Sequence, residues 1–536
     1  MTRPSPWLLP MLAFLLAAVT LAWWLPNRPR GEAVPTGRLN SVSFAPFRDG
    51  QSPLDGSFPT AAQVDADMAL LAPLVRAVRS YAAVEGSYDV AAIAARHGVK
   101  LWQGIWLGAD RAQNRREIAR AILMANTSPE TVERVVVGNE VLLRRDLPVD
   151  ELIAAIDQVR ASVRQPVTYA DVWEFWDRFP EIAAHVDIVT IHLLPHWEDT
   201  PTNVDGAIRH IEAIWRRFVA RYPDRKIAVG ETGWPSAGRW RDDAAPGVVA
   251  QARFVRGFLN FARREGLDYN LIEAFDQGWK HRNEGTVGAS WGLWTQDRQP
   301  KPALSGMVVE DSRWPRHAVL AAGLALALLA AGLTVPALPP PAQLRLAVLA
   351  VTAGTALAWA AATWDLAFDP YLKVAAAGNL AGQGMLAVLL MRRAAMLLVG
   401  RMPPPPRNGA QATAAVRALL RLRPAAGWRT GLFDDLGFVF LWAAAVLQLL
   451  LLVDPRYRDF PLPVFAVPLV AIAARGLLGD LPRSGGGREE AVAGGVLVAA
   501  ALASLVQEGP LNRQALAWTA AALVLALPAV LRLRRG

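Results

Sequence analysis

Two carboxylates each follow a short apolar run and a glycine. They are Glu140 in VVVGNEV and Glu231 in IAVGETGWPS. Runs of this length are typical of buried strands, and in a barrel of parallel strands the strand ends form the active face. Glycosidic bond hydrolysis needs two carboxyl groups, one to protonate the leaving oxygen and one to attack or to activate water. One such glutamate alone is more often a salt-bridged rim residue, but two in the same setting favour catalysis.

The spacing of the two carboxylates fits a barrel. They lie 91 residues apart, which at roughly 30 residues per strand-helix unit is three units, from strand 4 to strand 7. Eight apolar runs, most separated by amphipathic helical stretches, predict an α/β fold that closes into a (β/α)8 TIM barrel. The runs are 42–44, 75–81, 101–107, 132–137, 167–169, 186–194, 226–230 and 271–275, and the helical stretches include 111–124, 149–163, 204–222 and 248–264.

Further apolar segments are long enough to cross a bilayer, which takes about 20 helical residues. Residues 7–26 are flanked by arginines and are followed by no clear cleavage site, so an uncleaved anchor is favoured over a signal peptide. Seven more segments predict an all-α polytopic transmembrane domain, with the lipid bilayer as a partner. They are 318–338, 344–363, 374–390, 436–453, 460–478, 491–506 and 515–530.

Arginine placement predicts the orientation, because loops that stay inside carry the Lys and Arg excess. With the N-terminus inside, the outside loops beyond the barrel's end at Arg316 hold only Lys373, Arg456, Arg458 and Arg513. The inside loops and span ends hold Arg345, Arg392, Arg393, Arg401, Arg407, Arg417, Arg421, Arg423, Arg429, Arg475, Arg483, Arg488, Arg532, Arg534 and Arg535. The sequence therefore predicts an anchor over 1–30, an exported barrel over 31–315 and a membrane domain of about seven helices over 316–536.

Charge and composition exclude several classes of site. Of 56 Lys and Arg and 47 Asp and Glu residues, 20 and 10 lie in 316–536, which leaves 36 and 37 for 1–315. The exported part is thus near neutral and has no basic footprint for nucleic acid. The chain has no cysteine, and the spacing of His192 and His196 is interrupted by Pro195, so we predict neither a metal nor a cofactor.

Three motifs resemble glycoside hydrolase family 17, a family of retaining β-1,3-glucan-active barrels. They are VGNE around Glu140, GETGWPS at 230–236 and EAFDQGWK at 273–280, and the resemblance spans roughly residues 38–297. It implies that Glu140 is the general acid/base and Glu231 the nucleophile. In the HLLPHW segment at 192–197, the chain departs from the Tyr-Pro pair common in the family. The residues predicted to bind substrate are Tyr81, Asn139, His192, Trp234, Trp279, Lys280 and Glu284.

A family-17 barrel joined to many membrane helices is similar to bacterial enzymes of periplasmic or cyclic β-(1,3)/(1,6)-glucan synthesis. This similarity implies a transglycosylase with a β-glucan donor and acceptor and a glucan synthase as a further partner. It also implies a bacterial cytoplasmic membrane with the barrel on the periplasmic face. An endo-β-1,3-glucanase stays open, because water competes for the same intermediate. A glucan export or synthase component with an accessory barrel also stays open, although the inside loops are short for a nucleotide-sugar domain.

The arginine asymmetry makes a testable prediction about topology. Reporter fusions after Pro315 and after Gly409 should report opposite sides of the membrane, because three predicted spans separate the predicted outside end of the barrel from the predicted inside loop. Paired phosphatase and fluorescent reporters, each active on one side only, provide the measurement. The same sidedness at both positions would contradict the eight-span arrangement.

Overall fold

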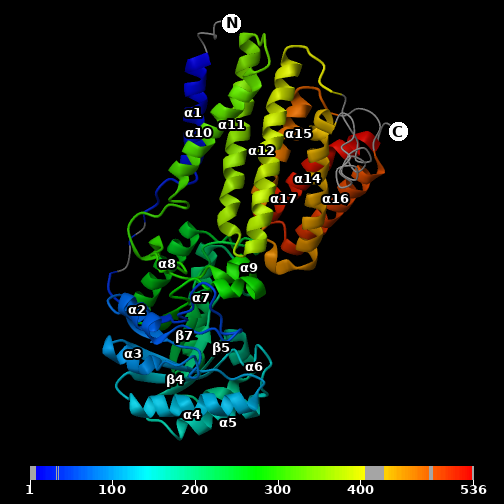
Figure 1. Cartoon of the computed structure of the whole chain (residues 1–536). Coiled ribbons are helices and arrows are strands. Elements are labelled where there is room, and N and C mark those ends of the chain that lie inside the picture. Colours follow the sequence, from blue (N-terminus) through cyan, green and yellow to red (C-terminus); the bar gives the residue numbers. More distant parts are fainter. Residues whose placement is uncertain (1–7, 32, 34–35, 405–427, 482–486, 534–536) are drawn as a thin grey trace. The chain divides into compact units, whose positions relative to one another are not determined.

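The computed structural model describes residues 8–31, 33, 36–404, 428–481 and 487–533. The chain divides into two compact units, one of residues 29–309 and one of residues 1–28 with 310–536. Figure 1 labels many of the elements of both units.

Residues 29–309 form a closed barrel of eight strands in sequential order. Each strand pairs in parallel with the next, and β8 closes on β1 with Leu271 opposite Val42. This arrangement confirms the predicted TIM barrel. The strands are β1 Leu39–Ser43, β2 Val75–Arg79, β3 Lys100–Ile105, β4 Val132–Asn139, β5 Val167–Val172, β6 Ile188–His192, β7 Lys226–Thr232 and β8 Asp268–Leu271.

Helices follow the strands, as the alternating pattern predicts. The four amphipathic stretches form α4, α5, α7 and α8, and Asp110 and Asn203 cap α4 and α7 by accepting backbone N–H bonds. The helices are α2 Ala61–Leu71, α3 Val90–Arg96, α4 Arg111–Thr127, α5 Val149–Arg160, α6 Trp173–Arg178, α7 Val204–Arg221, α8 Val248–Glu265 and α9 His281–Ala289. Short 3-10 turns lie at Pro180–Ala184, Gly278–Lys280 and Pro302–Leu304.

The last strand corrects one prediction. The apolar run 271–275 was expected to be strand 8, but β8 ends at Leu271, where that run begins. Beyond it the chain bends at Ile272 and Ala274. The Ala274 N–H donates to the Ser43 carbonyl of β1, and Phe275 forms a bridge with Trp294. Ala274 and Phe275 are fully buried, so the hydrophobic run continues past the strand and does not mark its end.

The interior of the barrel combines one large side chain with small ones. Trp102 is fully buried and clusters with Ala77, Val136 and Ala170. The chain also makes a close approach at Gly104, where an added Cβ would lie 2.3 Å from the Ser80 carbonyl oxygen. Because backbone lies at that distance, no side chain fits there, and β3 packs directly against the segment that follows β2.

The second unit is helical. Its helices are α1 Leu8–Trp24, α10 Trp314–Leu333, α11 Pro340–Ala361, α12 Pro370–Leu398, α14 Trp428–Val453, α15 Ala466–Leu477, α16 Arg488–Glu508 and α17 Arg513–Leu533. Figure 1 shows α10, α11 and α12 running alongside one another, and α16 packs on α14 and α17. Its buried core is rich in alanine and leucine.

Among the described residues, five helices are long and apolar enough to cross a membrane: 314–333, 340–366, 370–398, 431–453 and 488–508. The other three predicted spans correspond to shorter apolar helices at 12–24, 462–477 and 513–529. Most of the predicted inside loop, over 405–427 and including Gly409, lies outside the described residues, as does 482–486.

Candidate active site

The ends of four strands bring the predicted catalytic residues together. Asn139 ends β4 and is followed by Glu140, and Glu231 is the second-last residue of β7. Both strands deviate from regular pairing at this point, between Val136 and Asn139 and between Val229 and Thr232. Irregularities of this kind at barrel rims redirect side chains.

The backbone at Glu140 is unusual for a residue with a side chain. Its φ is 53°, in the left-handed region, and Gly138 before it has φ 86°. Few non-glycine residues adopt this conformation, and those that do cluster at functional sites. The Glu140 N–H still donates to the Ala170 carbonyl of β5 at 2.8 Å. The turn in GNE therefore aims the Glu140 side chain across the mouth of the barrel while the ladder to β5 continues.

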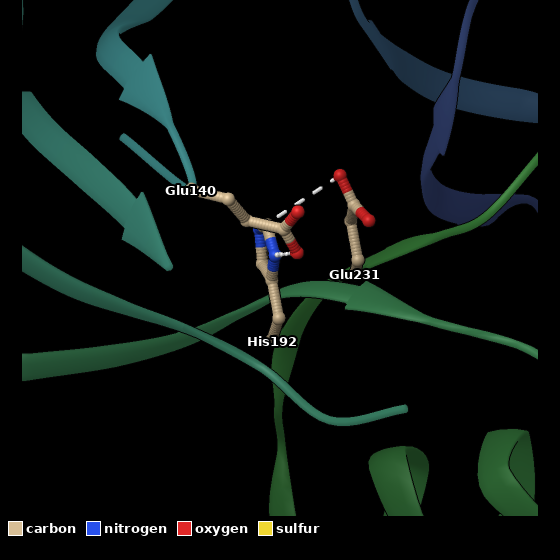
Figure 2. A group of neighbouring side chains, drawn as sticks. All are labelled: Glu140, His192 and Glu231. Atoms are coloured by element: carbon tan, nitrogen blue, oxygen red, sulfur yellow. Dashed lines mark hydrogen bonds and ion pairs between the residues drawn. The ribbon is translucent and has the colours of Figure 1, made fainter. Parts of the chain in front are cut away.

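The two carboxylates face one another across His192, the last residue of β6 (Figure 2). One oxygen of Glu140, one oxygen of Glu231 and one ring nitrogen of His192 all lie within 4.8 Å of one another. His192 Nδ1 is 2.9 Å from Glu140 Oε1, and its Nε2 is 3.8 Å from Glu231 Oε1. Glu231 is 4% exposed and His192 is fully buried, whereas the Glu140 side chain is 22% exposed.

Arg79, at the end of β2, neutralises this buried cluster. Its Nη1 donates to Glu231 Oε1 at 3.2 Å and to the Gly230 carbonyl at 2.7 Å, and its Nη2 donates to Asn139 Oδ1 at 2.5 Å. Arg79 is 1% exposed. The sequence analysis missed this residue. The available signal was an arginine at the end of the apolar run VRAVRSY, where a buried cation needs a buried anion.

Tyr81, predicted to bind substrate, lies beside Glu231. Its hydroxyl donates to Glu231 Oε1 at 2.8 Å. Because that hydrogen is committed, Ser43 Oγ donates in turn to Tyr81, and Asn270 Nδ2 donates to Ser43 Oγ at 2.7 Å. Burial and the neighbouring Glu231 raise the pKa of Tyr81 well above its usual value, so the phenol stays protonated. The three side chains form a relay of donors that ends at Glu231.

The residues after β8 supply a second cation. Lys280 Nζ donates to Glu273 Oε1 at 3.0 Å, and both side chains are largely buried. Burial lowers the pKa of Lys280, but Glu273, Glu284 and Glu231 around it raise the pKa above its usual value. The pKa of Glu284 is raised above its usual value. Burial and the charges of Glu140 and Glu231 raise it, and the charge of Lys280 opposes them. Glu273, the first residue of the motif at 273–280, was not among the predicted site residues, although it is 1% exposed.

Two predicted substrate contacts are not supported. Trp234 is 1% exposed, stacks on Phe254 and donates its Nε1 to the Ala245 carbonyl. It is therefore a core residue, and a sugar has no access to its ring. His192 is likewise fully buried and contacts Glu140 in place of solvent.

Trp279 is half-buried beside Lys280, whose Nζ is 5.7 Å from the ring centroid. The Nε1 of Trp279 donates to Gln277 Oε1 at 2.8 Å.

The donor types in Glu140, His192 and Glu231 raise the question of a metal ion. Arg79 argues against one on grounds of charge. Its Nη1 already donates to Glu231 and lies 3.4 Å from His192 Nε2, so a dication bound by these atoms would meet a buried guanidinium at contact distance. The cluster fits a pair of carboxylates held by an arginine better than it fits a metal centre.

Burial and hydrogen bonding act on Glu140 in opposite directions. Burial raises the pKa of Glu140, but the His192 hydrogen bond, followed by the charges of His192, Arg144 and Arg79, brings the pKa below its usual value. Hydrogen bonds to the ionised form of a carboxyl have this effect. Glu140 therefore favours its ionised form in the free site.

Comparisons with known proteins match the barrel that carries this site. Residues 41–292 match the model of the BtgE/BtgC glycoside hydrolase domain. The chain is 29% identical over 233 residues to the glucan 1,3-beta-glucosidase of Schizosaccharomyces pombe, covering 40% of this chain and 72% of that protein. It is 25% identical over 273 residues to the glucan 1,3-beta-glucosidase of Candida albicans, covering 47% and 88%. The predicted resemblance is confirmed, and the barrel is a glycoside hydrolase-like enzyme domain.

Among solved structures, the chain is similar to the glycoside hydrolase family 17 beta-1,3-glucanosyltransferase from Rhizomucor miehei. The identity is 23% and the TM-score 0.43, over 50% of this chain and 97% of that chain. An endo-laminarinase from Formosa is 19% identical with a TM-score of 0.42, over 48% and 84%.

The contact between Tyr81 and Glu231 predicts a loss of activity on removal of one oxygen. Tyr81→Phe should lower kcat/KM roughly 10- to 100-fold, because a hydrogen bond to a charged group contributes about 1.5–3 kcal/mol. The readout is the consumption of laminari-oligosaccharides by the full-length protein in detergent. Tyr269→Phe, which removes a hydroxyl that only accepts from the Asn40 N–H, is the matched control. Equal activities of the two variants would show that the Tyr81 hydroxyl has no such role.

Proposed function

We propose that the barrel is a retaining transglycosylase of β-1,3-linked glucan, with Glu231 as nucleophile and Glu140 as general acid/base. One observation supports it above the others: an oxygen of Glu140 lies within 4.8 Å of an oxygen of Glu231. Retaining glycosidases keep the two carboxyl groups about 5–5.5 Å apart, whereas inverting enzymes need about 6.5–9.5 Å to admit a water molecule. The short separation favours direct attack by Glu231.

In the first step, Glu231 attacks the anomeric carbon while Glu140 donates a proton to the departing glycosidic oxygen. The bond from that carbon to the oxygen breaks, and a glucosyl group is left covalently attached to Glu231. In the second step, Glu140 takes the proton of an acceptor hydroxyl, the acceptor oxygen attacks the anomeric carbon, and Glu231 is released as a carboxylate. Transfer results when the acceptor is a glucan, and hydrolysis when it is water.

Asn139 has a definite orientation for this chemistry. Its Oδ1 accepts from Arg79 Nη2, and arginine has no acceptor, so the amide nitrogen Nδ2 is the atom left to face the substrate. A donor here suits the 2-hydroxyl of the bound sugar, whose hydrogen bond strengthens in the transition state. Lys280 and Glu284 interact through their charges with the carboxylates of the site, and we propose that both contact the same sugar. We propose that the ring of Trp279 stacks on a neighbouring sugar.

The substrate class is supported by the names of the relatives. Those from Schizosaccharomyces pombe and Candida albicans are called glucan 1,3-beta-glucosidases. A second candidate, an endo-β-1,3-glucanase, is supported by the glucan endo-1,3-beta-glucosidase of Emericella nidulans, which is 25% identical over 46% of this chain and 42% of that protein. We favour transfer because the barrel is joined to a unit with five helices suited to a membrane, an arrangement expected of an enzyme that builds glucan.

The proposed location follows from the same helices. We infer that residues 1–30 anchor the chain, that residues 31–315 work on the periplasmic face of a bacterial cytoplasmic membrane, and that residues 316–536 are embedded in the bilayer. The arginine asymmetry of the loops supports this orientation. A glucan synthase in the same membrane is the partner that would supply the donor.

Substitution of the two carboxyls should separate their roles. Glu231→Gln should lose cleavage and transfer together, because no covalent intermediate forms. Glu140→Gln should slow the natural substrate by about 10²- to 10⁴-fold yet still release a nitrophenol from an activated β-glucoside oligomer, whose departure needs no proton. Glu130→Gln, at an exposed position away from the site, is the control. Loss of the nitrophenol burst in Glu140→Gln would exclude it as the acid/base.

Transfer should exceed hydrolysis in the native protein. With reducing-end-labelled β-1,3-gluco-oligosaccharides at millimolar concentration, products longer than the donor, or rings, should precede glucose and short oligosaccharides. Chain length and linkage are measured by chromatography and mass spectrometry over time. Products that are only shortened at every donor concentration would identify a hydrolase.

A further inference from the structure

His192 is a buried side chain to which the proposed mechanism gives no task. It is fully buried at the end of β6, and each ring nitrogen has a different neighbour. Nδ1 lies 2.9 Å from Glu140 Oε1, while Nε2 lies 3.4 Å from Arg79 Nη1 and 3.8 Å from Glu231 Oε1. Figure 2 shows the ring reaching up from β6 to the two carboxylates.

Arg79 determines which ring nitrogen carries the proton. A guanidinium has only donors, so the nitrogen that faces it, Nε2, is favoured as the acceptor. Nδ1, which points at Glu140 Oε1, then carries a proton whether the imidazole is neutral or charged. Oε1 is thereby occupied as an acceptor, and the second oxygen, Oε2, is the one that can carry the catalytic proton.

The slot that holds the ring is formed by the glycine before Glu231. A Cβ added at Gly230 would lie 2.8 Å from His192 Cδ2 and 2.6 Å from Thr190 Cγ2. Both distances are shorter than side-chain contacts allow. The absence of a side chain at Gly230 therefore lets the imidazole of His192 approach the backbone of β7 closely.

We propose that His192 is a positioning residue that holds Glu140 through Oε1 and favours its ionised form, the form that takes a proton from the acceptor hydroxyl. The inference rests on the proposed function and deepens it. In the second step the acceptor proton moves to Oε2 of Glu140, the new bond forms at the anomeric carbon, and the bond to Glu231 breaks with its electron pair. Glu140 ends protonated on Oε2 and is ready to act as the acid in the next turnover.

Other charged groups face this pair and enter the design of the test. Burial raises the pKa of Asp171 to about 6, so Asp171 titrates in a range where activity is measured. The groups are Arg79 of β2, Arg144 after β4, Asp171 of β5, Glu231 of β7 and Glu284 of α9. Asp171→Asn therefore serves as the control for a neighbouring carboxyl that is not bonded to His192.

The test is the pH dependence of kcat/KM for laminari-oligosaccharides, measured on the full-length protein in detergent. The alkaline limb reports ionisation of the free enzyme's essential acid, here Glu140. His192→Leu removes the donor that stabilises the carboxylate, so the limb should move to higher pH by about one unit or more. His192→Asn places an amide donor close to the position of Nδ1 and should keep the limb nearer the native value. Asp171→Asn removes a neighbouring negative charge that raises the pKa of Glu140, so it should move the limb to lower pH, opposite to His192→Leu.

The outcomes separate the two proposals. An unchanged alkaline limb in His192→Leu, with rates lowered equally at every pH, or a limb moved to lower pH, would overturn the role of His192. Glu140→Gln should abolish the limb; a limb that persists there would overturn the proposed function itself. If His192→Leu does not fold, as judged by tryptophan fluorescence and gel filtration, His192→Ala removes the donor without adding bulk and takes its place.

Discussion

The site depends on the charge balance of two mostly buried carboxylates, Glu140 and Glu231. One oxygen of Glu140 lies within 4.8 Å of one oxygen of Glu231. Uncompensated, such a pair would lose its charges, because burial penalises the ionised form and each carboxylate repels the other. Arg79 prevents this from the end of β2, with bonds to residues of β4 and β7. The guanidinium also orients Asn139 and the imidazole of His192. One cation thus sets the geometry of the proposed acid, nucleophile and sugar contact, and its five fixed donors suit that task better than a lysine would.

The strand pairing is irregular next to the residues of the site. The register shifts at the ends of β4, β6 and β7 lie beside the residues that make up the cluster. Glycines permit two of these departures in different ways. Gly138 supplies a positive φ, whereas Gly230 supplies the space for an imidazole ring. The glycines of the short motifs GNE and GET therefore determine the backbone conformation and the space around Glu140 and Glu231. The regularly paired strands of the barrel support this arrangement.

The sequence predicted whatever depends on local pattern. The eight strands, the long helices and the placement of Glu140 and Glu231 at strand ends follow from periodicity and spacing alone. It could not predict which charges become buried, so Arg79 and Glu273 were missed. The partners of Arg79, Glu231 and Asn139, lie far away along the chain, and no local pattern shows that Glu273 is buried against Lys280. Motif resemblance misplaced Trp234, because a match does not tell whether a ring faces the cleft or the core. Strand 8 was predicted too far along the chain for a related reason: apolar Ala274 and Phe275 are still buried after β8 has ended, where Ala274 bonds Ser43 of β1 and Phe275 forms a bridge with Trp294.

The donor relay from Asn270 through Ser43 and Tyr81 has an electronic consequence for the covalent state. All three donors point the same way, toward Glu231 Oε1. An ionised carboxylate accepts such bonds more strongly than an ester oxygen does, so the relay binds the free carboxylate more tightly than the glycosylated one. In the proposed mechanism this preference makes the intermediate a high-energy ester, poised to expel its carboxylate once an acceptor arrives. In this mechanism the hydrogen bonds from Asn270, Ser43 and Tyr81 thus shorten the lifetime of the covalent bond between Glu231 and the glucosyl group.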